Sequence, residues 1–284
     1  MKKLVFFILV ILAVKCDAQL LLSKQAIMQD SKFTDSLNFY DITYLSDGLK
    51  VKGFIIEPKH GKQLPVVIFN RGGNSDYAMI DHRLIEEWMA PVAKAGYIVV
   101  ASQYRGSPGS EGKDEMGGND VNDVLNLLPI ISTLPNADFN RIGMYGWSRG
   151  GIMTYRAIAK TNKIKTAIVG AAPTDLEREN KRRPGMDSLC CIMIPGYKTN
   201  RKAAIEERSV IYWREKLNRN TSLLILHGTA DWRVDYMEAQ RLADKLEQLK
   251  HPHTLRLFTG DDHGISKNRK ERDSMVLEWL KEHL

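Results

Sequence analysis

The residue best suited to nucleophilic chemistry is Ser148, which lies within Gly146-Trp147-Ser148-Arg149-Gly150-Gly151. An apolar run at residues 142–145 precedes this segment, and a helix-forming segment follows it at once. This order predicts a sharp strand-to-helix turn that lifts the serine hydroxyl clear of a sheet. Glycines suit the turn because a Cβ at either flank would clash, and the helix N-terminus would favour developing negative charge. The alternative is a glycine-rich turn without chemistry.

A serine hydroxyl needs a base within hydrogen-bond reach, and a carboxylate must orient that base. Asp231 follows the apolar run 223–226, and His263 follows the run 255–258. The order Ser, Asp, His, with separations of 83 and 32 residues, is the order found in folds with such a turn. We therefore expect Ser148, Asp231 and His263 to form a catalytic triad at one edge of a sheet.

Other residues could fill two of these roles. Asp231 could instead cap the following helix, with Asp235 as the rival acid. His227 ends a strand beside a glycine, which favours a role in shaping its loop. The remaining histidines lie in polar turns, in the tail or before a helix, so His263 is the predicted base.

The tetrahedral intermediate of acyl transfer needs hydrogen-bond donors for its oxyanion. One predicted donor is the backbone N–H of Arg149, directly after the nucleophile. The second is expected from the loop Asn70-Arg71-Gly72-Gly73-Asn74, with Arg71 and Gly72 as the candidates. This loop could also be a plain tight turn. Trp147, beside the nucleophile, is the candidate substrate-binding residue.

The elements that must position these residues are mostly buried strands alternating with helices. Residues 39–58 read as a hairpin around Ser46-Asp47-Gly48. Further strands are predicted at residues 66–69, 97–100, 142–145, 167–169, 223–226 and 255–258. Helices are predicted at residues 84–95, 121–134, 152–160, 236–249 and 270–284. The fold class is therefore α/β, with a mixed, mostly parallel central sheet and helices on both faces.

A segment without strand signals, residues 176–220, interrupts this alternation. It holds eleven Lys and Arg residues against six Asp and Glu residues, a local charge of +5. Insertions at this point overhang the carboxyl ends of the strands, so we expect a helical cap insertion over the pocket. A solvated helical insertion without such a role is the alternative.

The N-terminus has the form of a bacterial secretory signal peptide, residues 1–18. A basic start precedes an apolar run at residues 4–14, and small residues stand at −3 and −1 before a cleavage site after Ala18. A lipoprotein through Cys16 is less favoured because Lys15 precedes it, and a retained anchor is the third alternative. The mature chain, 19–284, is then the catalytic domain in a secreted or periplasmic location, with no membrane span.

Composition and charge limit the class of protein and the partners that it could bind. Apolar residues make up 43% and charged residues 26%, which is typical of a soluble globular protein. The formal charge of +7 falls to +5 without the leader, and no motif indicates a nucleic-acid partner. Cys190 and Cys191 are adjacent, a strained geometry for one disulfide, and show no metal-ligand spacing. The oligomeric state stays open.

Five segments together resemble the catalytic domain of the prolyl oligopeptidase family of serine peptidases, an α/β-hydrolase. They are residues 46–53, 104–107, 146–151, 227–231 and 262–264, and the resemblance covers about residues 35–284. The resemblance implies that Ser148, Asp231 and His263 are the triad and that neither a metal nor an organic cofactor is required. Its Gly-Trp-Ser-x-Gly-Gly form is similar to that of the dipeptidyl-peptidase and acylaminoacyl-peptidase branches.

Two features differ from that family. Its peptidases usually carry an N-terminal β-propeller, for which these 284 residues leave no room. Several members place a tyrosine in the oxyanion loop where this sequence has Arg71, which could still donate and would add positive charge. The leading expectation is a serine hydrolase that cleaves small peptides through an acyl-enzyme. The alternatives are an esterase acting on acylated small molecules or sugars and a non-catalytic binding protein.

Overall fold

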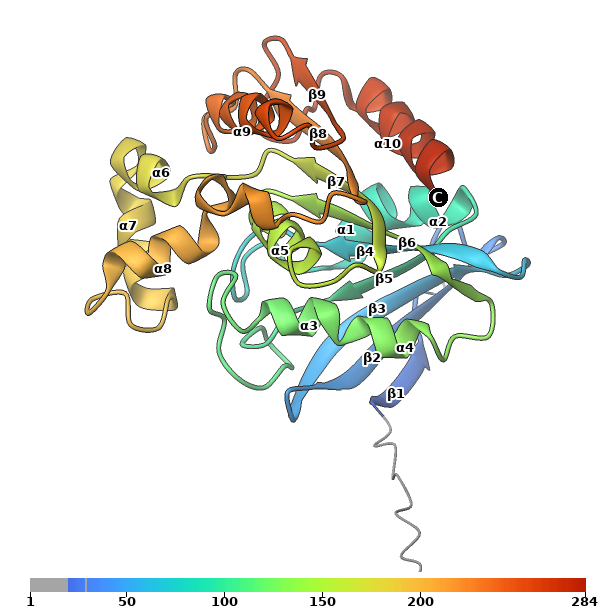
Figure 1. The fold of residues 1–284 in the computed structure, drawn as a ribbon. Coiled ribbons are helices and arrows are strands. Elements are labelled where there is room, and N and C mark those ends of the chain that lie inside the picture. The colour runs from blue at the N-terminus through green and yellow to red at the C-terminus, as the bar shows by residue number, and fades with distance from the viewer. Residues whose placement is uncertain (1–19, 29) are drawn as a thin grey trace, which may run out of the picture.

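The computed structural model describes residues 20–28 and 30–284, and the predicted leader lies outside this part of the chain. Its centre is a nine-stranded sheet in the order β1-β2-β3-β5-β4-β6-β7-β8-β9 (Figure 1). The strands from β5 to β9 pair in parallel, whereas β1, β2 and β3 pair antiparallel and join the rest through β5. This is the α/β-hydrolase arrangement that the sequence predicts.

The antiparallel edge contains the predicted hairpin. Strands β2, Leu37–Ser46, and β3, Leu49–Pro58, pair along their whole length. Asp47 and Gly48 form the two-residue turn and both have positive φ, as such tight hairpins require. Strand β1, Leu21–Ala26, is a mostly exposed edge strand that is not among the strands predicted from the sequence.

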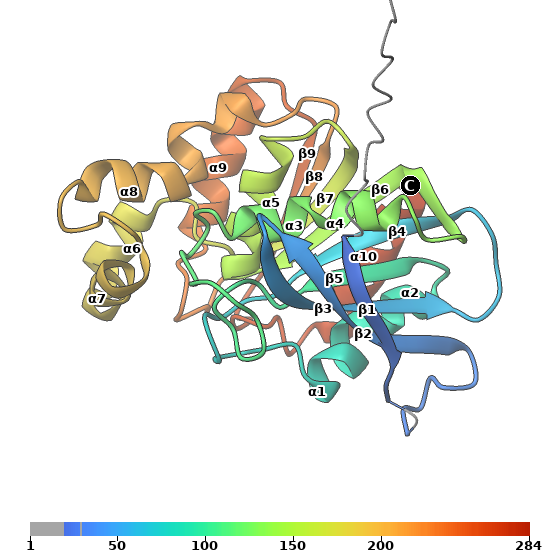
Figure 2. The same cartoon turned by 90° about the horizontal axis from the view of Figure 1, so that it is seen from below.

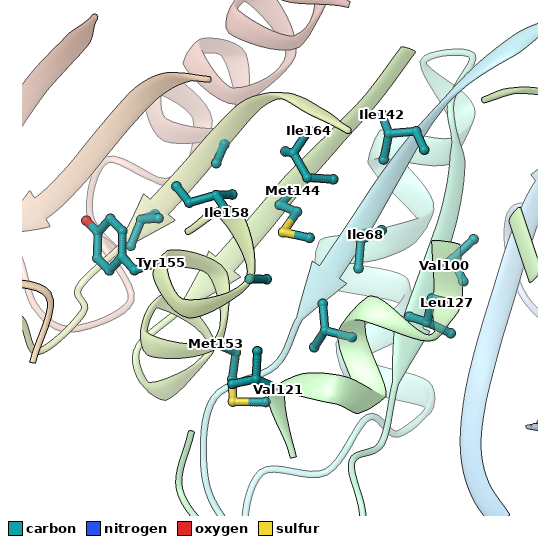
Figure 3. Close-up of a cluster of buried hydrophobic side chains, with 14 of the residues drawn as sticks. Ile68, Val100, Val121, Leu127, Ile142, Met144, Met153, Tyr155, Ile158 and Ile164 are labelled. Carbon is teal, nitrogen blue, oxygen red and sulfur yellow. The ribbon is translucent and has the colours of Figure 1, made fainter. Parts of the chain in front are cut away.

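Five of the parallel strands are largely buried on both faces, as their continuous apolar runs predict, but the edge strand β9 alternates partly buried and exposed residues up to Phe258, so the prediction of a buried strand there is wrong. They are β4, Leu64–Asn70; β5, Ile98–Ser102; β6, Ala137–Trp147; β7, Ile164–Gly170; β8, Ser222–Gly228; and β9, His253–Phe258. Alternate residues of one strand enter different cores: Ile68 and Met144 lie in one, Phe69 and Tyr145 in the other. Figure 3 shows the first core between the sheet and α5, Arg149–Ile158.

Helices cover both faces of the sheet (Figures 1 and 2). The first core also contains apolar residues of α3, Val121–Leu125, α4, Leu127–Ile131, and α9, Met237–Gln248. The second contains those of α2, Ala90–Lys94, and α10, Arg269–His283. Two predicted helices are interrupted: α1, His82–Leu84, and α2 flank a π-helical turn, η1, Ile85–Met89, while Asn126 separates α3 from α4.

The insertion between β7 and β8 is helical and strand-free, as predicted. It contains α6, Leu176–Arg182; α7, Pro184–Met193; α8, Arg201–Arg208; and two 3₁₀ turns, η2, Val210–Tyr212, and η3, Arg214–Lys216. Its helices project to one side of the sheet in Figure 1. A separate apolar cluster joins Leu176, Cys190 and Ile205 to Ile152 of α5, so the insertion packs against the helix that begins directly after the predicted nucleophile. No helix in the described residues is long and apolar enough to cross a membrane.

Candidate active site

Ser148 lies at the turn from β6 into α5, with φ 56° and ψ −124°. A non-glycine residue in this region is strained and is found where function requires the conformation. The flanking glycines are obligatory on steric grounds. A Cβ on Gly146 would lie 2.3 Å from the carbonyl oxygen of Gly150, and one on Gly150 would lie 1.9 Å from that of Asn70. The strained strand-to-helix turn predicted from the sequence is therefore present.

The loops after β8 and β9 bring the predicted acid and base together. The two strands are paired up to Gly228 and Phe258. Beyond them, the backbone N–H of Ala230 donates to the carbonyl of Asp261 at 2.8 Å. His263 Nδ1 then lies 2.7 Å from Asp231 Oδ2. Asp235, the rival acid, instead accepts from Arg178 at 2.8 Å.

The Asp231 carboxylate receives several hydrogen bonds in a buried position. His227 Nε2 lies 3.1 Å from the same Oδ2 that His263 contacts, and the backbone N–H groups of Arg233 and Val234 donate to Oδ1 at 2.8 and 3.1 Å. Burial alone would raise the pKa of Asp231, but the hydrogen bonds from His227 and His263 outweigh it. The pKa of this carboxyl is held well below its usual range, so the group stays ionised.

His227 thus has a more specific position than its sequence context indicates. Its imidazole is fully buried, and Nε2 lies 3.1 Å both from Asp231 Oδ2 and from the carbonyl oxygen of Val234. These contacts fix the loop that carries the acid, in agreement with the loop-shaping role expected from the sequence.

Ser148 and His263 line the same cavity. The Nδ1 contact with Asp231 directs the other ring nitrogen, Nε2, away from the carboxylate. No direct hydrogen bond joins Ser148 Oγ and His263 in this structure. Such bonds are often long in unliganded enzymes and tighten when substrate binds. The arrangement brings all three predicted residues to one site.

Trp147 also lines the cavity, where it supports the base. Its indole N–H donates to the backbone carbonyl of His263 at 2.9 Å. The ring packs edge-on against Trp88, with centroids 4.8 Å apart. Arg272 stacks on Trp88 at 4.0 Å and donates to the carbonyl of Gly264 at 2.6 Å. Trp147 is therefore both a lining residue and an anchor of the loop that carries His263.

The oxyanion loop lies beside the nucleophile because β4 and β6 run in register up to Asn70 and Gly146. A Cβ on Gly72 would lie 3.3 Å from Ser148 Cβ. Within the described part of the chain, the backbone N–H groups of Gly72, Gly73 and Arg149 have no protein acceptor. These three groups are the available donors for an oxyanion at Ser148.

The Arg71 side chain has a different role from the one its position suggested. It is fully buried and donates to the carbonyls of Gly72, Ser75 and Gln103 at 2.9, 2.9 and 3.1 Å, and to Ser107 Oγ at 2.8 Å. Burial and the nearby cation of Arg149 lower its pKa to about 10. The guanidinium is occupied by these acceptors and does not line the cavity. It shapes the oxyanion loop from behind and does not supply a donor to the cavity.

An ion-pair network that the sequence analysis missed surrounds the Arg149 side chain. Its Nη1 and Nη2 each lie 2.6 Å from an oxygen of Asp114, and Nη2 also contacts Asp120. Nη1 donates to the carbonyl of Gly73 at 3.1 Å, and Asp114 accepts from the backbone N–H of Ser75 at 2.8 Å. The network ties the turn at Ser148 to the oxyanion loop. A cluster of acidic residues at 111–123 was the available signal, but nothing local indicated its partner.

The cavity has a volume of about 310 Å³ and mixes apolar with charged walls. Its lining comes from the oxyanion loop, the nucleophile turn, the insertion and the loops of the acid and base. The residues are Phe69, Gly72, Gly73, Asn74, Tyr77, Ala78, Leu84, Trp88, Met116, Trp147, Ser148, Arg149, Ile152, Pro173, Glu179, Arg183, Met186, Leu189, Arg233, Val234 and His263. Because α6 and α7 contribute Glu179, Met186 and Leu189, the insertion forms one wall of the pocket.

Known proteins resemble this chain along most of its length. The chain is 28% identical over 251 residues to an uncharacterized peptidase, YtmA, of Bacillus subtilis, covering 86% of this chain and 94% of that protein. Among solved structures, an acylaminoacyl peptidase of Pyrococcus horikoshii superposes with a TM-score of 0.75 at 21% identity, covering 89% of this chain and 43% of that one. An acetyl xylan esterase of Paenibacillus sp. R4 superposes with a TM-score of 0.71 at 16% identity, covering 92% and 88%.

The coverage differs among these relatives. The chain spans most of YtmA, but only 38% of a second Bacillus subtilis peptidase, YuxL, with which it is 26% identical. The solved structures are too distant in sequence to show more than the shared α/β-hydrolase fold. The sequence profile of the prolyl oligopeptidase family matches residues 85–284, which include the whole predicted triad. The chain therefore belongs to the prolyl oligopeptidase family of serine peptidases.

Proposed function

We propose that this protein is an exported serine hydrolase that cleaves amide bonds of small peptides through an acyl-enzyme. The observation that carries the proposal is the contact of Asp231 with His263, which shares a cavity with Ser148 and with backbone N–H groups that have no protein acceptor among the described residues. Membership of a peptidase family favours amide substrates. YtmA is named as a peptidase and matches nearly the whole chain.

In the proposed mechanism, Ser148 Oγ attacks the substrate carbonyl while His263 Nε2 accepts the hydroxyl proton. The ionised Asp231 holds the imidazole tautomer and stabilises the imidazolium that forms. The oxyanion accepts hydrogen bonds from backbone N–H groups of Arg149 and the 72–73 segment, each worth about 3 kcal/mol when preorganised. His263 then protonates the leaving amine, and a water molecule activated by the same base releases the acyl group.

A carboxylic-ester hydrolase acting on acylated small molecules or sugars is the second candidate. The same groups would cleave esters, and the apolar walls at Phe69, Leu84 and Trp88 suit an acyl chain. The esterase of Paenibacillus sp. R4 shares the fold over a similar chain length. Parallel kcat/KM measurements on aminoacyl amides and short acyl esters separate the two candidates, since strong amide turnover is difficult for a simple esterase.

The catalytic proposal is tested by labelling with a fluorophosphonate probe. Wild-type protein is expected to gain one probe adduct on Ser148, and Ser148→Ala is expected to lose both labelling and turnover. Ser188→Ala, an exposed serine on α7, serves as the matched control and should label like wild type. Unchanged labelling of Ser148→Ala would refute the assignment.

Export is part of the proposal and rests on residues 1–18 alone. Expression with the full leader in a bacterial host, followed by intact mass measurement of the secreted or periplasmic protein, is expected to give a chain that begins at Gln19. A chain that begins at a lipid-modified Cys16 would instead indicate a lipoprotein.

A further inference from the structure

Part of the positive charge of the insertion is neutralised by partners within the fold. Four of its seven arginines pair with nearby carboxylates at 2.6–3.0 Å: Arg178 with Asp235, Arg182 with Glu179, Arg201 with Glu177 and Asp187, and Arg208 with Glu207. The excess of basic residues seen in the sequence therefore does not make a uniform positive surface. Any role in binding must come from the cations that these pairs leave over.

Two arginines of the cavity wall are left over in this way. Arg183, which follows α6, and Arg233, in the loop of the catalytic acid, both line the cavity and are partly buried. Among the described residues neither has a carboxylate within 4.0 Å, whereas the third lining arginine, Arg149, is matched by two aspartates. The one acidic lining residue, Glu179, is already paired with Arg182.

Most hydrogen-bond donors of these two guanidinium groups are also unused. Arg183 Nη1 donates to the carbonyl of Arg233 at 2.6 Å, and Arg233 Nη1 donates to the hydroxyl of Tyr77 at 2.8 Å. Within the described chain, Nε and Nη2 of both residues have no protein acceptor. Two guanidinium forks with free N–H groups match the geometry of a carboxylate, which can accept from both.

Two exposed aromatic rings contact these guanidinium groups. Both stack on Trp232, with distances to the ring centroid of 6.0 Å for Arg183 and 5.0 Å for Arg233, and Arg233 also lies 6.0 Å from the ring of Tyr77. Trp232 and Tyr77 are 66% and 53% exposed, unusually large fractions for such rings in this molecule. Cation–π contacts place both positive charges against one ring without neutralising them, which favours an anion at this wall of the cavity.

We infer that Arg183 and Arg233 form a subsite that binds a carboxylate of the substrate while its scissile carbonyl lies at Ser148. The inference rests on the proposed hydrolase function and names its substrate class as carboxylate-bearing short peptides. The carboxylate can be the free C-terminus of the peptide or the side chain of an acidic residue. Both sources present the same planar group to the two forks.

Steady-state kinetics on matched peptides test this subsite. One pair differs only by a C-terminal carboxylate or carboxamide, and a second pair only by Glu or Gln. Wild type is expected to favour the carboxylate member of at least one pair by about tenfold or more at low salt, since charged hydrogen bonds contribute that much. The preference should shrink as ionic strength rises. The pair that shows the preference identifies the source of the carboxylate.

The variants Arg183→Gln and Arg233→Gln are each expected to lower this preference toward one. The ratio within a pair is the readout because it cancels any general effect on turnover. Lys198→Gln is the matched control: it removes one exposed positive charge from the same insertion but does not line the cavity. Equal kcat/KM within both pairs for wild type, or a preference that survives both arginine variants, would overturn the inference.

A binding measurement separates failure of the subsite from failure of the proposed reaction. Calorimetric titration of the Ser148→Ala protein with the carboxylate and carboxamide peptides needs no turnover. Tighter binding of the carboxylate peptide, lost in Ser148→Ala combined with Arg183→Gln, supports the subsite even if no peptide is hydrolysed by wild type. Equal binding of the two peptides contradicts it even if wild type proves to be an active hydrolase.

Discussion

Replacement of Arg149 by Met should be among the most damaging single changes to this fold. Arg149 is 4% exposed, and its guanidinium is the shared partner of Asp114 and Asp120, which are 8% and 0% exposed. Removing one member of a buried ion pair leaves uncompensated charge and costs about 3–5 kcal/mol. The free energy of unfolding of Arg149→Met should therefore fall by roughly this amount at neutral pH.

The loss should depend on pH in a defined direction. Burial already raises the pKa of Asp120, and Arg149 is the main influence that lowers the pKa of Asp114. Without the guanidinium, both folded-state pKa values should rise above the unfolded value of about 3.9. Such groups contribute stability that is present below the unfolded pKa and is lost as pH rises through the folded pKa. The deficit of the variant should therefore be larger at pH 8 than at pH 5.

Urea denaturation of both proteins at the two pH values measures this effect. The triple variant Arg149→Met, Asp114→Asn, Asp120→Asn should recover much of the loss because it leaves no buried charge. Arg83→Met is the control, since its side chain is 81% exposed and its pair with Glu87 contributes at most about 1 kcal/mol. If Arg149→Met and Arg83→Met lose the same stability at both pH values, the reasoning is wrong.

Three further predictions concern the site and its surroundings. Asp231→Asn should lower kcat by on the order of 10³- to 10⁴-fold. Because the folded-state pKa of Asp231 is depressed, the ionised carboxylate should stabilise the fold at pH 7, and this stabilisation should decline as pH falls below about 4. Urea denaturation of both proteins at pH 7 and pH 3 would measure the difference. Gly150→Ala should prevent folding or lower the free energy of unfolding by more than about 3 kcal/mol, since its methyl group would lie 1.9 Å from a backbone oxygen. Gly185→Ala is the control, because a Cβ on Gly185 meets nothing within 4 Å. Soluble yield and urea midpoint should differ sharply between the two alanine variants. Burial raises the pKa of the Cys190 thiol to about 11, so iodoacetamide at pH 8 should modify the partly exposed Cys191 first. Peptide mass mapping that finds Cys190 modified first in the folded protein would contradict this.

The features that the sequence predicted well are those set by short stretches of chain. The turn at Asp47 and Gly48 follows from residues that tolerate positive φ, and the buried strands follow from unbroken apolar runs. Strand β1 was not predicted because its alternation of apolar and polar residues is weak and its residues are mostly exposed. The interruptions of the two helices were not predicted because the spacing of apolar residues by three or four positions continues across the π-helical turn and across the break at Asn126.

In the candidate site, too, the features set by local sequence were predicted and those set by tertiary contacts were not. Ser148, Asp231 and His263 could be placed because each follows a recognisable strand, and parallel strands end at a common edge. The fates of the Arg71 and Arg149 side chains could not be predicted, since both depend on acceptors that only the tertiary fold brings near. Arg71 donates to Gln103 and Ser107, and Arg149 pairs with Asp114 and Asp120, all some thirty residues away in the chain.

The end of α6 is fastened to the loop of the catalytic acid. Arg182 and Arg183 donate to the carbonyls of Trp232 and Arg233, while the backbone N–H of Arg233 donates to Asp231. These hydrogen bonds join two segments that are fifty residues apart in the chain. An engineer who grafts a foreign insertion onto this scaffold to change its specificity would need to transplant the segment 231–235 with it, or the imidazole would lose its orientation along with the old selectivity.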